Sequence, residues 1–186
     1  MKKTLFINLF GAPGSGKSTG ATYIFSKLKM SGIDAEYIGE FAKDKCWEKN
    51  AFMFECPENQ FYIGAKQFYR INQVDGKVDV AVTDSPLFLN TIYNKSKYLG
   101  KEYDFVTYRL FNKFNNLNFL IKRVKPYNPN GRNQTEDEAK EIQSDLILNL
   151  FNFEIPFTEI SGDKEGYDMA VDIILKKIGA FNGNFN

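Results

Sequence analysis

A glycine-rich motif near the start of the sequence constrains the fold more than any other feature. It reads FGAPGSGKST from Phe10 to Thr19 and matches the pattern G-x-x-x-x-G-K-[ST]. The fixed positions of this pattern are filled by Gly11, Gly16, Lys17 and Ser18. An apolar run of strand type precedes the motif, and apolar residues spaced for one helix face follow it. Strand, glycine loop and helix in this order predict a backbone that wraps its N–H groups around a phosphate.

The polar residues of the motif have distinct tasks when a nucleoside triphosphate binds. Lys17 is expected to reach the β- and γ-phosphates, and the Ser18 hydroxyl to ligate Mg²⁺. An ordinary glycine-rich turn before a helix is the alternative, which the intact strand–loop–helix context disfavours. We therefore expect ATP and Mg²⁺ as cofactors, with the nucleotide held by Gly11, Gly14, Ser15, Gly16, Lys17, Ser18 and Thr19.

Composition excludes several classes of protein. With 186 residues, the chain is expected to form one α/β domain over residues 1–186. The 24 Lys and Arg nearly balance the 23 Asp and Glu, which argues against a large basic surface for duplex DNA. The chain has no His, and Cys46 and Cys56 lack metal-type spacing, so we expect neither a zinc site nor a Cys–His nucleophile. Without a signal peptide or a membrane-spanning stretch, a cytoplasmic monomer or homodimer is expected.

Strand and helix signals alternate along the chain. Such alternation predicts an α/β, three-layer P-loop fold, in which helices cover both faces of a five-stranded parallel sheet. In the helix predicted over residues 104–115, Phe105, Tyr108 and Phe111 are expected to face the core. The first predicted helix follows the glycine motif, carries Ala21, Ile24, Phe25 and Leu28 on one face, and is stopped by Ser31-Gly32. The other predicted helices cover residues 58–73, 136–153 and a last segment that carries Ala170 to Ile178. The predicted strands cover residues 4–10, 35–39, 78–83, 118–123 and 156–160.

Two carboxylates follow predicted strands and are candidates for the chemistry. Parallel strands present their carboxyl ends to the ligand, so residues that follow them are expected beside the phosphates. Asp84 is expected to hold Mg²⁺ or to act in catalysis, the alternative being a helix N-cap before Ser85-Pro86. Glu40 is expected to take a proton from an attacking hydroxyl, the alternative being a surface residue that begins a helix.

The predicted helix over residues 58–73 carries Gln60 and Gln67 on one face. Two amides there are expected to read the hydrogen-bonding edge of a base or a carboxamide, although a solvent-facing polar stripe would look the same. Gly162 follows the last predicted strand, where adenine is expected to rest against backbone, although a Ser-Gly-Asp turn needs no ligand.

A stretch rich in Pro, Asn and Gly occupies residues 125–135, between a predicted strand and a predicted helix. In a phosphate-transfer fold this is the position of a short lid. Arg132 lies in it and Arg123 ends the preceding strand, and either guanidinium could stabilise the transferred phosphoryl group. Arg123 could equally be a surface residue at the end of a strand.

These motifs together resemble the P-loop kinases of the nucleoside- and nucleotide-kinase group, in particular NadR-like ribosylnicotinamide kinase domains and related ATPases that bacteriophages often encode. The resemblance rests on the segments at residues 11–18, 37–41, 60–69, 82–86 and 131–132. It implies transfer of phosphate from ATP to a hydroxyl or phosphate of a nucleoside, nicotinamide riboside or nucleoside monophosphate. It also implies that Glu40 or Asp84 is the base and that Arg132 is the lid arginine. If a phage encodes the chain, the expected location is the cytoplasm of the infected host.

Two other functions stay open at this point. Lysines and aromatic residues between Lys43 and Phe54 mix charge with stacking surfaces, as binding of a polynucleotide strand requires. A kinase acting on a polynucleotide end or a modified DNA base is therefore the second hypothesis, disfavoured by the nearly neutral net charge. A P-loop ATPase without any small-molecule acceptor is the third.

Overall fold

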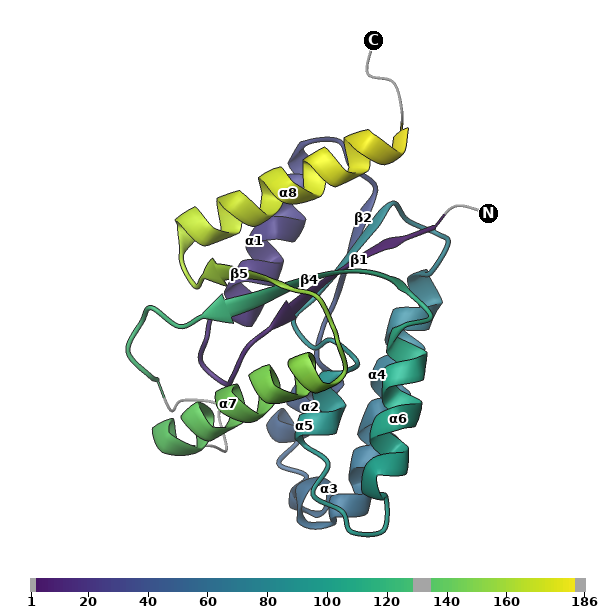
Figure 1. Cartoon of the computed structure of the whole chain (residues 1–186), viewed down its shortest axis with the longest axis vertical. Coiled ribbons are helices and arrows are strands. Elements are labelled where there is room, and N and C mark those ends of the chain that lie inside the picture. The colour runs from purple at the N-terminus through teal and green to yellow at the C-terminus, as the bar shows by residue number, and fades with distance from the viewer. Residues whose placement is uncertain (1–2, 129–134, 183–186) are drawn as a thin grey trace.

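Five parallel strands form the centre of the molecule, as expected from the sequence (Figure 1). The computed structural model describes residues 3–128 and 135–182. The strands lie in the order β2-β3-β1-β4-β5. Their bounds are β1 Leu5–Phe10, β2 Ala35–Ile38, β3 Val80–Thr83, β4 Asn115–Lys122 and β5 Thr158–Ser161. Because β1 is central and pairs with both β3 and β4, the glycine motif begins at the middle of one sheet edge.

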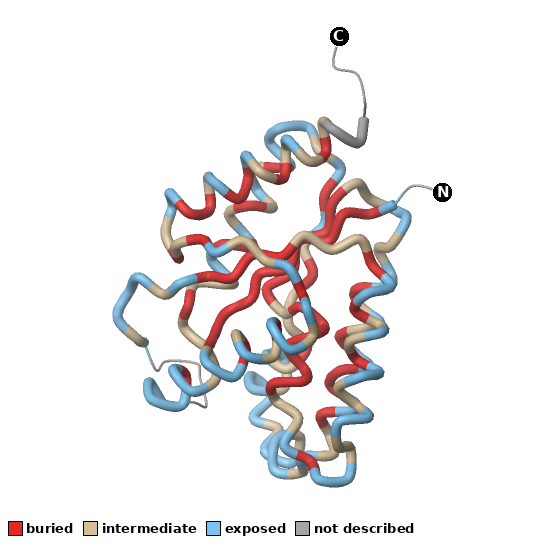
Figure 2. The backbone as a smooth tube through the Cα atoms, in the orientation of Figure 1, coloured by how far each residue is buried: buried red, intermediate tan, exposed pale blue. Residues whose placement is uncertain are grey.

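Helices cover both faces of the sheet, which makes three layers (Figure 1). One face is covered by α1 (Lys17–Met30) and α8 (Lys164–Asn182), and the other by α4 (Gln60–Val74), α6 (Gly100–Phe111) and α7 (Glu136–Asn152). Alternate residues of β1 serve the two sides: Leu5, Ile7 and Leu9 belong to the first core, whereas Phe6 and Phe10 belong to the second. Figure 2 shows the strands as one buried band between these layers.

Short helices were not predicted in two places. Between β2 and β3 the chain forms α2 (Phe41–Trp47), α3 (Ala51–Glu55) and the 3₁₀ turn η1 (Pro57–Asn59) before α4. Between β3 and α6 it forms α5 (Leu89–Ile92). In α2 and α3 the sequence has no clear apolar period that would predict a helix. Accordingly, α2 buries Phe41 alone and α3 buries no residue.

The prediction for residues 104–115 was wrong in its bounds and partly in its buried face. Helix α6 ends at Phe111, and β4 already begins at Asn115. Phe111 is buried as expected, but Phe105 is 57% exposed, and its ring packs against that of Phe153. The predicted lid over residues 125–135 lies partly outside the described residues, and Arg132 wholly so. No helix in the described residues is long and apolar enough to cross a bilayer.

Candidate functional site

The glycine motif forms a tight loop between β1 and α1. Gly14 and Gly16 have φ angles of +82° and +105°, which residues with a Cβ rarely adopt. A Cβ on Gly16 would also clash with the hydroxyl of Tyr167, which instead donates a hydrogen bond to the Gly16 carbonyl (3.0 Å). Helix α1 begins at the next residue, Lys17, so its free N–H groups face the loop. This geometry suits an anionic phosphate.

The ammonium group of Lys17 lies against the backbone of its own loop. Its Nζ donates to the carbonyl oxygens of Gly11 (2.7 Å) and Ala12 (3.0 Å). A lysine in this position has to exchange those carbonyls for phosphate oxygens when a triphosphate binds. The exchange is cheap, because one set of charge-assisted hydrogen bonds replaces another.

A cavity of about 640 Å³ starts at this loop and extends under α2, α3 and α4; we call it the large cavity. Its volume falls in the range of small-molecule sites. Glu40 and Asp84 both line it. Its loop end is lined by Pro13, Gly14, Gly16, Lys17, Ser18 and Thr19. We call the part formed by α2, α3, α4 and the segment around α5 its far end; it is lined by aromatic, amide and lysine side chains that include Lys43, Trp47, Phe54, Gln60, Asn90, Tyr93 and Lys95.

Asp84 directly follows β3 and is only 2% exposed. Burial, together with the nearby carboxylate of Asp84, raises the pKa of the Tyr37 hydroxyl on the neighbouring strand β2, yet Oδ1 of Asp84 has no hydrogen-bond partner among the described residues. A buried carboxylate oxygen without a partner is costly unless a cation completes it. Asp84 does not cap the next helix, since α5 begins only at Leu89 after Phe88. The environment of Asp84 therefore fits a Mg²⁺ ion, with the Ser18 hydroxyl in the same cavity as a second ligand.

Glu40 lies at the end of β2, one residue beyond Gly39, and begins α2 without a side-chain capping bond. Burial raises the pKa of its carboxyl; the charge of Lys17 lowers it, and that of Asp84 raises it again. The net direction is upward. A carboxylate whose pKa lies above the usual value accepts a proton more readily, as a general base must.

The two glutamines predicted to read a substrate have different environments. Gln67 is 1% exposed, and its amide is engaged with backbone: Oε1 accepts from Phe41 N (3.0 Å), and Nε2 donates to the carbonyls of Gly39 (3.4 Å) and Ser85 (3.1 Å). It therefore ties together the chain segments that carry Glu40 and Asp84. Gln60 donates to the Asn90 Oδ1 (2.7 Å) and lines the far end of the large cavity.

Several residues of this cavity were not predicted from the sequence. Tyr93 is half-buried there, and burial together with the charge of Glu40 raises its pKa, so its hydroxyl stays a donor at neutral pH. Asn90 joins Gln60 to the Leu87 carbonyl through its Nδ2 (2.8 Å). Both residues belong to the segment around α5, whose short apolar run carries no pattern that marks a site.

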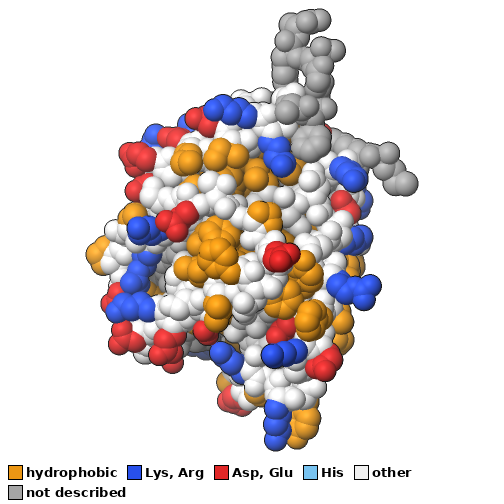
Figure 3. Space-filling view, in the orientation of Figure 1, with side chains coloured by type: hydrophobic (Ala, Val, Ile, Leu, Met, Phe, Trp, Pro, Cys, Tyr) orange, Lys and Arg blue, Asp and Glu red, His pale blue; other side chains and the backbone are white. Residues whose placement is uncertain are grey.

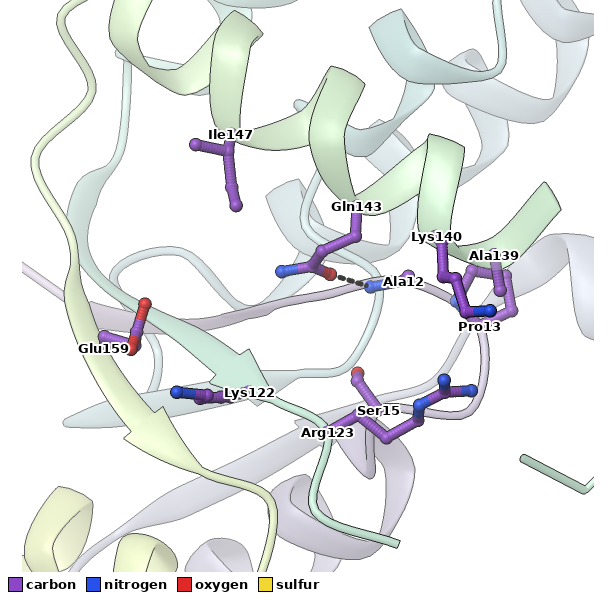
Figure 4. Close-up of a pocket in the computed structure, with 10 residues that line it drawn as sticks. All are labelled: Ala12, Pro13, Ser15, Lys122, Arg123, Ala139, Lys140, Gln143, Ile147 and Glu159. Atoms are coloured by element: carbon purple, nitrogen blue, oxygen red, sulfur yellow. Dashed lines mark hydrogen bonds between the residues drawn. The ribbon is translucent and has the colours of Figure 1, made fainter. Parts of the chain in front are cut away.

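Arg123 and Gly162 lie on another side of the glycine loop. Arg123 lines a second cavity of about 270 Å³, the small cavity, between the loop, β4, β5 and α7 (Figure 4). Its Nη2 donates to the Glu136 carboxylate (2.7 Å), while its Nη1 is buried and has no hydrogen-bond partner among residues 3–128 and 135–182. Gly162 touches the loop itself: a Cβ there would clash with the Ser15 carbonyl. The large cavity thus contains Lys17, Glu40, Asp84, Gln60 and Gln67, but neither of these two residues.

Comparison with known sequences gives one match. The sequence model of a family described as an AAA domain, AAA_28, matches residues 6–166. The search among curated proteins gives no match.

Solved structures resemble the chain in fold at low sequence identity. NadR in complex with NAD and AMP-PNP has a TM-score of 0.70 and 15% identity over 95% of this chain. NadR in complex with NR has a TM-score of 0.72 and 16% identity, also over 95%. The chain covers only 50% and 51% of these two NadR chains. Deoxyadenosine kinase from M. mycoides, with the products dcmp and dcdp, has a TM-score of 0.56 and 16% identity over 94% of this chain and 99% of that one.

Proposed function

This chain belongs to the AAA domain family AAA_28, and from that premise we propose that it transfers the γ-phosphoryl group of ATP to a hydroxyl of a nucleoside-like small molecule. The observation that carries this proposal is the continuity of the large cavity. It joins the glycine loop to a wall of aromatic and amide side chains, and Glu40 and Asp84 line the same space. A nucleotide switch or motor needs the loop but no pocket for an acceptor.

The base that Glu40 offers favours a hydroxyl over a phosphate as the acceptor. A hydroxyl benefits from a base, and the raised pKa of Glu40 suits that task. A phosphate acceptor needs no base, and its charge would meet the lysines Lys43 and Lys95 as well as the two carboxylates. Nucleoside, nicotinamide riboside and nucleoside monophosphate remain the compounds to compare, and the NadR and deoxyadenosine kinase structures, which hold NR and dcmp, support this choice of compounds.

In this mechanism the residues of the chain mainly position groups and neutralise charge. The loop N–H groups and Lys17 hold the phosphates, Glu40 accepts the proton of the acceptor hydroxyl, and Gln60 and Asn90 orient the acceptor. A bound Mg²⁺, held by Ser18 and Asp84, would neutralise phosphate charge. Arg132, in the lid predicted from the sequence, and Arg123 are the arginines proposed for the transferred group, and Gly162 for the nucleotide.

A transfer screen tests this function. Labelled ATP is incubated with nucleosides, nicotinamide riboside, nucleoside monophosphates and oligonucleotides, and products are identified by mass. We expect phosphate to appear on a nucleoside hydroxyl, and Lys17→Met to abolish transfer with an unchanged melting temperature. Lys29→Met, at an exposed position of the same helix, is the matched control and should transfer normally.

Two results of the screen would contradict the proposal. ADP released at the same rate with every compound would indicate an ATPase without an acceptor. Labelled oligonucleotide would indicate a polynucleotide kinase, a reading that the surface disfavours, since charges of both signs are interspersed on the face shown in Figure 3.

A further inference from the structure

A side chain of α7 contacts the glycine loop from outside. The Gln143 Oε1 accepts a hydrogen bond from the backbone N–H of Ala12, the second residue of the motif, at 2.7 Å (Figure 4). Because Ala12 is 6% exposed, its N–H would lack a partner without this glutamine and would have little access to water. Gln143 is not among the residues proposed above for the function.

The bond spans the small cavity. This space of about 270 Å³ is lined by Ala12, Ser15 and Arg123 on one side and by Gln143 and Ile147 of α7 on the other. Figure 4 shows the amide of Gln143 reaching the Ala12 N–H from its helix. A change of this side chain therefore leaves the main core of the protein intact, so its effect reports on the bond.

The peptide group between Gly11 and Ala12 contains this N–H, and its carbonyl is that of Gly11. This carbonyl accepts a hydrogen bond from Lys17 Nζ (2.7 Å), a contact that is expected to change when ATP binds. When Lys17 moves to the phosphates, the carbonyl loses the lysine, whereas the N–H keeps Gln143. The glutamine thus contributes more to holding the loop in its nucleotide-bound form than in its free form.

Helix α7 is also anchored at its start. Glu136, its first residue, accepts a hydrogen bond from Arg123 at the end of β4 (2.7 Å). Thr135 and Glu138 form a reciprocal capping box at the same end. The helix that follows the predicted lid is thereby fixed to the sheet at one point and to the glycine loop, through Gln143, at another.

We propose that Gln143 is a positioning residue for ATP: it holds the first peptide of the glycine loop in the conformation that binds phosphate. The inference rests on the proposed function, because it assumes that the loop binds ATP. The inference adds a residue of α7 to that function and links this helix, which follows the predicted lid in sequence, to the phosphate site.

Direct binding of a non-hydrolysable ATP analogue, measured by calorimetry with Mg²⁺ and without acceptor, tests the inference. Gln143→Leu keeps the shape but removes the acceptor oxygen, and we expect its Kd to rise about fivefold or more, as for a lost buried hydrogen bond. Gln143→Glu keeps an oxygen within reach and should bind within about twofold of wild type. Ser144→Ala, whose hydroxyl bonds only within α7, is the matched control and should not change the Kd.

Kinetics separate positioning from a purely structural effect. The KM for ATP should rise in Gln143→Leu, while the KM for the acceptor stays near that of wild type and the melting temperature falls only by the cost of one unpaired N–H. A Gln143→Leu protein that binds ATP as tightly as wild type overturns the inference and leaves the proposed function standing. Equal weakening in Gln143→Leu and Gln143→Glu also overturns it, because the oxygen would then be irrelevant. Wild-type protein that binds no ATP overturns both.

Discussion

Glu40 and Asp84 interact electrostatically across the large cavity that both line. Burial and then the negative charge of Asp84 raise the pKa of Glu40, against the opposing charge of Lys17. The two carboxylates come from neighbouring strands, β2 and β3, which end at the same edge of the sheet. The environment of Asp84 fits a cation, whereas that of Glu40 fits a proton. The two carboxylates therefore suit different tasks in the proposed reaction.

The raised pKa of Glu40 predicts how activity depends on pH. A base must be deprotonated, so kcat/KM should rise with pH. The midpoint of this acid limb should lie above the usual carboxyl pKa of about 4.3. Glu40→Gln should remove this limb and lower kcat/KM by roughly 10²- to 10⁴-fold. Glu36→Gln, an exposed site on the same strand, is the control. A Glu40→Gln enzyme that keeps the acid limb would assign the proton transfer to another group.

The same shift predicts the sign of a stability effect. A carboxyl whose pKa is raised in the folded state stabilises the fold below its unfolded pKa, and that contribution is lost as the pH rises through the folded pKa. At neutral pH the buried charge of Glu40 is therefore a cost. Urea unfolding at pH 7.5 should find Glu40→Gln at least as stable as wild type; a clear loss of stability would point to an unrecognised favourable partner of Glu40.

Asp84→Asn should weaken the binding of Mg²⁺ and should also shift the acid limb of the pH profile of activity. Loss of the carboxylate should raise the Mg²⁺ concentration at half-maximal rate about tenfold or more, and chelation of Mg²⁺ should stop transfer in the wild type. Since Asp84 raises the pKa of Glu40, the acid limb should also move to lower pH. Titrations of Mg²⁺ at several pH values measure both, with the exposed Asp145→Asn as control. An unchanged Mg²⁺ requirement would remove Asp84 from the proposed metal site.

Gln67→Leu and Gln60→Leu should separate structure from recognition. Loss of the Gln67 amide leaves buried backbone groups of the Glu40 and Ser85 segments unpaired, so the free energy of unfolding should fall by about 2–4 kcal/mol. Gln60 bonds another side chain and lines the large cavity, so its change should raise the KM for the acceptor more than it lowers stability. Denaturation curves and acceptor kinetics test the pair. Normal stability with a raised KM in Gln67→Leu would instead support direct substrate contact.

Gly162→Ala tests the contact between the β5–α8 turn and the glycine loop. The added methyl group would collide with the Ser15 carbonyl and push the loop out of place, so ATP binding should weaken. Gly179→Ala adds the same group to α8 in open space and should raise stability by up to about 1 kcal/mol. Calorimetry and thermal melting compare the two variants. Equal ATP affinity in both would show that the turn adjusts without disturbing the loop.

Much of the sheet and one half of the site follow from local sequence signals. The apolar runs of β1 and β3 are fully buried, and strands of that kind are legible without context. Because parallel strands end at one edge, Glu40 and Asp84 could be placed beside the glycine motif from their positions after strands. Their separation, and the sign of the shift in the pKa of Glu40, depend on tertiary contacts.

The remaining features depend on contacts distant in sequence. Gln143 lies 131 residues from its partner Ala12, and nothing near it in the chain marks which N–H it accepts from. Phe105 fits the apolar period of its helix, yet α6 buries Thr107 and Phe111 instead and leaves the ring at the surface. The amide side chain of Gln67 is of a type that often recognises a ligand, but in the folded chain it forms hydrogen bonds with backbone groups.

The segment between β2 and α4 suggests where acceptor specificity can change most freely. Helix α3 buries no residue, Trp47 is 71% exposed, and yet this segment supplies Lys43, Trp47 and Phe54 to the wall of the large cavity. The strands and the helices around the glycine loop, by contrast, belong to the two buried cores. Under the proposed function, residues 42–57 could therefore be replaced or redesigned as a cassette that changes the acceptor preference at little cost in folding and leaves the nucleotide-binding part untouched.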